Sequence, residues 1–115
     1  DQPMATQIWN TFRNRWMGAL WQSIGAQVIP TVTWAGPESY QFCFMGLPQR
    51  SMLAVSTVGC IRAAEARAFY IQGYTEMVRR LQPSLVLVYG KPIDEVSHLA
   101  PVRYYAHRWR SVVTK

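Results

Sequence analysis

The sequence predicts an α/β protein in which helices alternate with parallel strands. Segments with helical spacing of apolar residues alternate with short apolar or β-branched runs, in the order α-β-α-β-α-β. Such alternation implies a parallel sheet with helices packed on it. The chain has 115 residues, of which 50% are hydrophobic and 13% aromatic. We therefore expect residues 1–115 to form a single α/β domain with a packed core.

The first predicted helix runs from Pro3 to Gly25, because proline is favoured at a helix start and glycine just past its end. Its apolar residues have helical spacing: Ala5, Ile8, Trp9, Phe12, Trp16, Ala19 and Leu20. The opposite side is mixed, so we expect the helix to be covered on two sides. Arg13 and Arg15 need partners if they are buried, and structural ion pairing is the favoured explanation. The candidate carboxylates are Asp1, Glu38 and Asp94.

The first predicted strand covers residues 27–34, which are mostly β-branched and apolar. Pro30 cannot donate a ladder hydrogen bond, so it indicates a sheet edge or a bulge. A short helix follows, opened by Gly36 and Pro37 and closed by Gly46.

The second half of the chain continues the alternation. Residues 51–57 are the second predicted strand, and residues 62–82 carry the clearest helical pattern. Residues 84–90 are a near-continuous apolar run, which predicts a third strand buried on both faces. Residues 91–101 suit a loop or one helical turn. Residues 102–115 alternate weakly and are either a final strand or an extended basic arm.

Charge favours an anionic partner. The chain has 12 basic and 6 acidic residues, for a net charge of +6. All basic residues except Lys91 and Lys115 are arginine, which makes planar bidentate contacts to phosphate. This balance favours polyanions such as nucleic acid, although it also suits an ordinary soluble surface.

The two cysteines predict neither a metal site nor a cofactor. Cys43 and Cys60 lie in apolar contexts without CxxC spacing, so we expect reduced, buried thiols and a cytoplasmic protein of a bacterium or infected host. No apolar run approaches the ~18 residues of a membrane span, so no membrane is predicted as a partner.

The strand ends are the predicted ligand site, because ligands of parallel α/β folds bind beyond the carboxyl ends of the strands. The predicted ligand-binding residues are Trp34, Ser56, Thr57, Gly59, Arg62, Tyr89 and Lys91. The hydroxyl groups, the glycine backbone, the N-terminal amides of the next helix and the nearby arginine together suit a bound phosphate. For Ser56 and Thr57 taken alone, a capped turn is the favoured alternative. Lys91 is a phosphate clamp, an activated lysine or a solvated loop lysine. Trp34 either stacks on a base or a sugar, or it caps the core.

The C-terminal segment mixes basic and aromatic residues. This combination suits single-stranded nucleic acid, because charge follows the backbone while rings stack on bases. The predicted nucleic-acid-binding residues are Arg103, Tyr105, Arg108, Trp109 and Arg110. The alternative is an edge strand whose charges block aggregation.

The sequence assigns no catalytic residues. Its six acidic residues form no pair with acid/base spacing, and it lacks G-x-S-x-G and H-E-x-x-H motifs. A hydrolase with its site at the same strand ends remains an alternative, as does a structural module that self-associates through the aromatic first helix.

Several segments together resemble a family of bacterial and phage proteins catalogued as a domain of unknown function. They are "RNRW", "VIPT" with Trp34 after two intervening residues, "STVG" and "VYGK", and the resemblance covers roughly residues 1–95. It implies a phage or mobile-element setting and brings no established activity. It also implies that this chain is the C-terminal part of a larger doubly wound or barrel-like protein, in which an upstream segment or a second copy covers apolar surface.

Overall fold

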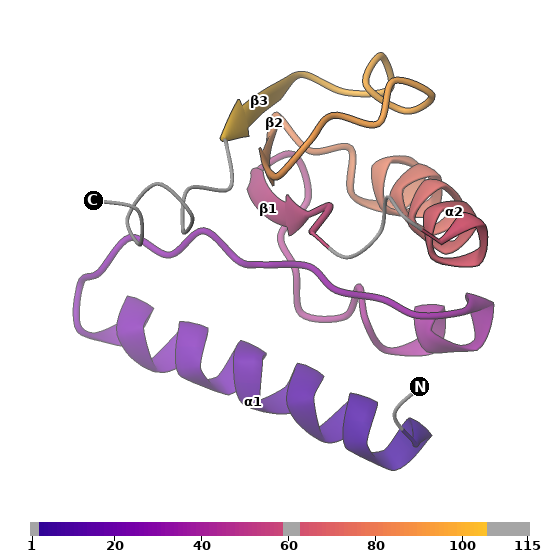
Figure 1. Ribbon diagram of the computed structural model, residues 1–115. Helices are drawn as coiled ribbons and strands as arrows, with labels where there is room; N and C mark the ends of the chain where they lie inside the picture. The colour runs from indigo at the N-terminus through magenta and orange to yellow at the C-terminus, as the bar shows by residue number, and fades with distance from the viewer. Residues whose placement is uncertain (1–2, 59–62, 106–115) are drawn as a thin grey trace, which may run out of the picture.

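The computed structural model describes residues 3–58 and 63–105 and confirms an α/β fold with parallel strands (Figure 1). In chain order the elements are α1 (Met4–Ser23), the 3-10 helix η1 (Pro37–Gln41), β1 (Met52–Ser56), α2 (Ala64–Leu81), β2 (Leu85–Tyr89) and β3 (Val102–Tyr105). The strands lie in the order β1-β2-β3, and both neighbouring pairs are parallel. None of the helices in the described ranges is long and apolar enough to cross a membrane.

The predicted strand at 27–34 is mostly wrong, because only a single parallel bridge joins Thr31 to Ala54 of β1. The Ala54 N–H donates to the Pro30 carbonyl at 2.9 Å, and the Val32 N–H donates to the Ala54 carbonyl at 2.8 Å. Pro30 has no N–H with which to continue the ladder. The segment therefore lies at the edge of the sheet, as Pro30 indicated. The third strand of the sheet is instead β3, the start of the predicted C-terminal strand.

One face of the sheet packs against α2 and forms the core (Figure 1). The buried residues of β1 and β2 are Leu53, Val55, Val86 and Val88, and those of α2 include Tyr70, Tyr74, Met77 and Leu81. Tyr70 and Tyr74 stack with ring centroids 5.7 Å apart. Burial, with a smaller contribution from Tyr104, raises the pKa of Tyr74 to about 12. α2 ends where Gln82 adopts a left-handed conformation, immediately before Pro83.

Among residues 3–58 and 63–105, no helix or strand covers the other face of the sheet, which is called the open face below. Leu85 and Leu87 are half-buried and Tyr89 is exposed, whereas the residues between them are buried. The apolar run of β2 had predicted burial on both faces, and that prediction is wrong. The run is apolar because alternate residues serve the core, while the intervening residues form a partly exposed apolar floor on the open face.

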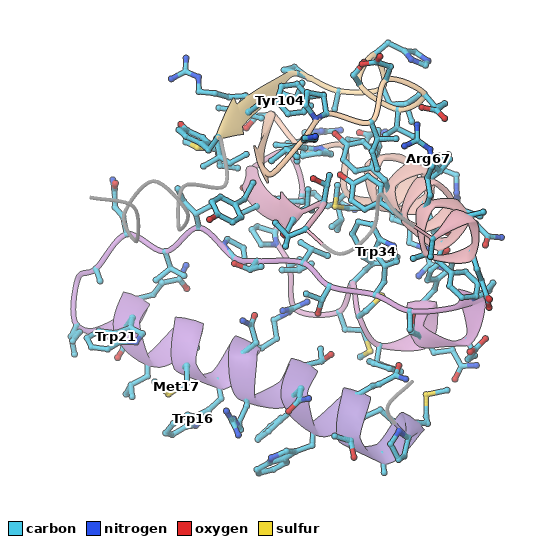
Figure 2. The ribbon with its side chains drawn as sticks, in the orientation of Figure 1. Trp16, Met17, Trp21, Trp34, Arg67 and Tyr104 are labelled. Atoms are coloured by element: carbon cyan, nitrogen blue, oxygen red, sulfur yellow. The ribbon has the colours of Figure 1, made fainter. Side chains whose placement is uncertain are left out.

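α1 turns its polar side towards the rest of the molecule. It contains no buried residue, and the half-buried ones are Gln7, Thr11, Arg15 and Gly18, which follow one another at helical spacing. Figure 1 shows that the extended segment 26–36 separates α1 from the sheet. Within the described residues α1 is covered on one side only, so cover of its second side by a partner, a second copy or an upstream segment stays a prediction. Its large apolar residues are all exposed, and Trp16 and Met17 project away from the sheet (Figure 2).

Candidate functional site

The exits of β1 and β2 are joined by one buried threonine. The Thr57 hydroxyl donates to the Lys91 carbonyl at 2.8 Å, and the Thr57 N–H donates to the Tyr89 carbonyl at 2.9 Å. Gly90 has φ +117°, and a Cβ there would lie 2.3 Å from the Thr57 hydroxyl oxygen. The strand ends are thus held together, as the sequence predicted for a common edge. Thr57 itself is occupied by backbone carbonyls, and Lys91 is exposed beside it.

Trp34 and Ser56 line the same hollow at this edge, with a volume of about 420 Å³. The Ser56 hydroxyl accepts a hydrogen bond from the Val58 N–H at 3.1 Å. The Trp34 indole N–H donates to the Phe69 carbonyl at 3.0 Å, and its ring lies against Gly73 of α2. Trp34 is therefore fixed by packing, as Figure 2 shows between the extended segment and α2.

The hollow offers shape and hydroxyls rather than acid/base groups. Its described lining consists of Val32, Thr33, Trp34, Ala35, Ser56, Val58, Ala66, Phe69 and Tyr70. Within that described lining there is no histidine, lysine or carboxylate to activate a serine. Tyr89 and Lys91 are also outside it.

The open sheet face carries a row of exposed groups at the carboxyl end. Ser56, Tyr89 and Tyr105 are in-register partners on β1, β2 and β3, so their side chains share one face. Tyr89 is 41% exposed and Tyr105 is 46% exposed. Arg103 lies one row back on the same face, aligned with Leu87, and it is exposed too. Two aromatic rings and a guanidinium therefore gather on neighbouring strands.

Five predicted site residues lie outside the described ranges. They are Gly59, Arg62, Arg108, Trp109 and Arg110. Cys60 also lies outside, whereas Cys43 is a buried free cysteine, as predicted. Burial raises the pKa of the Cys43 thiol, partly offset by a hydrogen bond with Ser39. Among the residues that the structure describes, no cluster of three or more metal-ligating side chains is found.

Much of the basic charge on α2 is already paired. Arg67 forms an ion pair with Glu95 at 2.7 Å, and Glu76 pairs with both Arg79 and Arg80. Hydrogen bonds from Arg79 and then Arg80 hold the pKa of Glu76 below its usual value. Other exposed basic residues have no ion pair within the described part of the chain: Arg13, Arg50, Lys91 and Arg103. Of these, Arg103 is the one that adjoins the tyrosine row.

Sequence reasoning did not predict that the polar side of α1 would face the segment that follows it. Arg15 donates to the carbonyls of Met45 at 2.8 Å and Cys43 at 2.6 Å, and to the side-chain oxygen of Asn14 at 2.7 Å. Backbone carbonyls thus replace the carboxylate partner that was expected for a buried arginine. The signal was available as the spacing of Gln7, Thr11 and Arg15, which repeats every four residues.

These features define a small α/β fold whose parallel sheet is left uncovered on one face by the described residues, with polar and aromatic groups at its carboxyl edge. The chain belongs to the family described as Domain of unknown function (DUF4417), which matches residues 1–106. The resemblance inferred from the short motifs is thereby confirmed.

The relatives are phage proteins. The Gene 1 protein of Mycobacterium phage L5 is 40% identical over 111 residues, which are 95% of this chain and 48% of that protein. The Gene 1 protein of Mycobacterium phage D29 is 42% identical over 111 residues, 95% of this chain and 41% of that protein. The chain thus spans less than half the length of either relative. No solved structure matches it.

Proposed function

We propose that this protein binds single-stranded nucleic acid across the open face and carboxyl edge of its sheet. The observation that carries the proposal is the pair of exposed rings, Tyr89 and Tyr105, in register on neighbouring strands. Neighbouring strands lie about 4.8 Å apart, so the two rings offer adjacent stacking positions on one face. Stacking accepts any base, because every base has a π-face.

Charge and shape support the same surface. Arg103 lies two residues before Tyr105 on the same side of β3, roughly 7 Å away along the strand. Its guanidinium suits a phosphate of a strand whose bases lie on the tyrosines. Ser56 belongs both to the tyrosine row and to the hollow at Trp34, so that hollow extends the surface beyond the sheet edge. The net charge of +6 supports attraction of a polyanion.

Fluorescence anisotropy with a labelled oligothymidylate, and with a duplex of equal length, tests the proposal across a salt series. Affinity for the single strand should fall as salt rises, because phosphate contacts release counterions. Tyr105→Ser should weaken single-strand binding by at least about fivefold, since one stacked base contributes about 1–3 kcal/mol. Phe12→Ser is the matched control, because it removes a ring from α1 that is at least as exposed as Tyr105.

A second pair of variants tests the charge. Arg103→Gln should lower affinity and reduce the salt slope by about 0.7. Arg13→Gln removes an exposed arginine of α1 and should change neither as much. Absence of salt-dependent binding at low salt, or equal losses in Tyr105→Ser and Phe12→Ser, would overturn the proposal.

A further inference from the structure

A polar hollow of about 410 Å³ lies between the inward side of α1 and the segment that follows it. α1 contributes Gln7, Asn10, Thr11, Asn14 and Arg15, and the remaining lining is Thr31, Thr33, Trp34, Ala35, Ser39, Phe42 and Cys43. Amide and hydroxyl side chains thus predominate on a helix side that normally packs through apolar residues. The volume lies within the range of sites for small molecules, about 300–1,000 Å³.

Arg15 is the single charged residue in the described lining of this hollow. It is half-buried, and three of the five N–H groups of its guanidinium have acceptors. All three acceptors are neutral oxygens, so no carboxylate within the described ranges balances the charge. Burial lowers the pKa of Arg15, and guanidinium nevertheless stays protonated in proteins. A fixed positive charge therefore stands at a polar cavity.

The fixed geometry of Arg15 makes it suitable for binding. Its bonds to the Met45 and Cys43 carbonyls hold the guanidinium in place before any ligand arrives. A preorganised side chain loses less conformational entropy on binding than a mobile one does. Arg15 and Asn14 also border a second hollow of about 550 Å³, but its lining is mainly apolar. The first hollow is the one whose chemistry complements a charged, hydrogen-bonding ligand.

We propose that the hollow between α1 and residues 31–43 binds a small molecule through an oxyanion group, phosphate or carboxylate, with Arg15 as its charge partner. The neighbouring amides and hydroxyls of Asn14, Thr11 and Thr33 hold the polar remainder of the ligand. A charge-assisted hydrogen bond to guanidinium is about twice as strong as a neutral one. This site contains no residue of the tyrosine row, although Thr33, Trp34 and Ala35 also border the hollow at Ser56, and it does not depend on the nucleic-acid proposal.

Thermal unfolding of the whole chain tests the site with two probes, sodium phosphate and sodium succinate, each compared with sodium chloride at equal ionic strength. The probe that carries the preferred oxyanion should raise Tm by about 5 °C at a tenfold excess over its Kd. Thr11→Leu fills the hollow and should abolish that rise. Thr6→Leu makes the same change on α1 outside the lining and should retain it.

Arg15→Lys keeps the charge but loses the planar fork, and it should weaken binding of the active probe at least tenfold. Tyr105→Ser should leave the rise intact, and Thr11→Leu should leave oligothymidylate binding intact, so the two proposals can fail separately. The proposal is overturned if neither probe raises Tm above the chloride reference. It is equally overturned if the rise persists in Thr11→Leu, because the anion would then bind elsewhere.

Discussion

Gly73 in α2 provides a sharp test of the packing, because replacement by alanine should destabilise the protein. Alanine in a helix interior ordinarily stabilises by about 1 kcal/mol relative to glycine. Here an added Cβ would lie 2.0 Å from Nε1 and 2.2 Å from Cδ1 of Trp34. The indole cannot remain in place beside that methyl group, so the propensity gain is opposed by a steric clash.

The magnitude follows from what Trp34 would lose by moving. Forcing an extra methyl group into a packed site costs about 1–3 kcal/mol. The hydrogen bond from the indole N–H to the Phe69 carbonyl contributes about 0.5–1.5 kcal/mol more. The ring also contacts Phe44 and Tyr70, with centroids 6.2 Å and 5.7 Å away. After the gain in helix propensity is subtracted, Gly73→Ala should destabilise by about 2 kcal/mol.

Urea unfolding followed by circular dichroism measures this loss, which corresponds to a fall in Tm of about 8 °C. Gly18→Ala in α1 is the matched control, because its Cβ would meet the Val28 side chain at an ordinary 3.6 Å. That control should match or exceed the stability of the natural sequence by up to about 1 kcal/mol. If Gly73→Ala behaves like Gly18→Ala, the contact between Trp34 and α2 is refuted.

Three further perturbations probe other parts of the molecule. Thr57→Val removes the donor of the part-buried hydrogen bond to the Lys91 carbonyl and should cost about 1 kcal/mol in urea unfolding, so an unchanged midpoint would contradict the joined strand exits. Trp16 is 55% exposed, and Trp16→Ser should change stability by less than about 0.5 kcal/mol, whereas a loss above about 2 kcal/mol would show that α1 packs inward. Hydrogen bonds from Arg79 and Arg80 lower the pKa of Glu76, so its contribution is present above the unfolded value of about 4.3 and is lost as pH falls through the lower folded value. Glu76→Gln should flatten the stability profile below about pH 5 by no more than about 1 kcal/mol, and a profile identical to the natural one would rule this contribution out.

The alternation of helices and parallel strands could be predicted because it depends on local pattern. β1, α2 and β2 each lie within the range that their apolar spacing predicted. The pattern of residues 27–34 is typical of a strand, but the segment forms only one bridge to β1 because Pro30 has no N–H to continue the ladder. Whether the second face of β2 is covered depends on partners far away in the sequence, so the apolar run alone could not decide it.

The sequence predicted at which edge of the sheet the candidate site lies, but not which side chains share one face there. Parallel strands place their carboxyl ends together, and the structure joins Thr57 to the exit of β2 as that rule requires. The pairing of Tyr89 with Tyr105 depends on the register between β2 and β3, which no local pattern reveals. The roles proposed for the strand-end residues stay predictions.

α1 shows why periodicity alone does not determine which side of a helix faces the protein. The apolar stripe of Ile8, Phe12 and Trp16 is regular, yet all three are exposed while the polar side faces inward. Helices in proteins gain most of their stability from tertiary packing, whereas α1 is tied to the following segment by the Arg15 hydrogen bonds to the Met45 and Cys43 carbonyls. Contiguous exposed apolar surface of this kind marks interaction sites. Coverage of this surface by a second copy or by an upstream segment therefore stays a prediction. Light scattering distinguishes the two, because self-association depends on protein concentration and coverage by a segment of the same polypeptide does not.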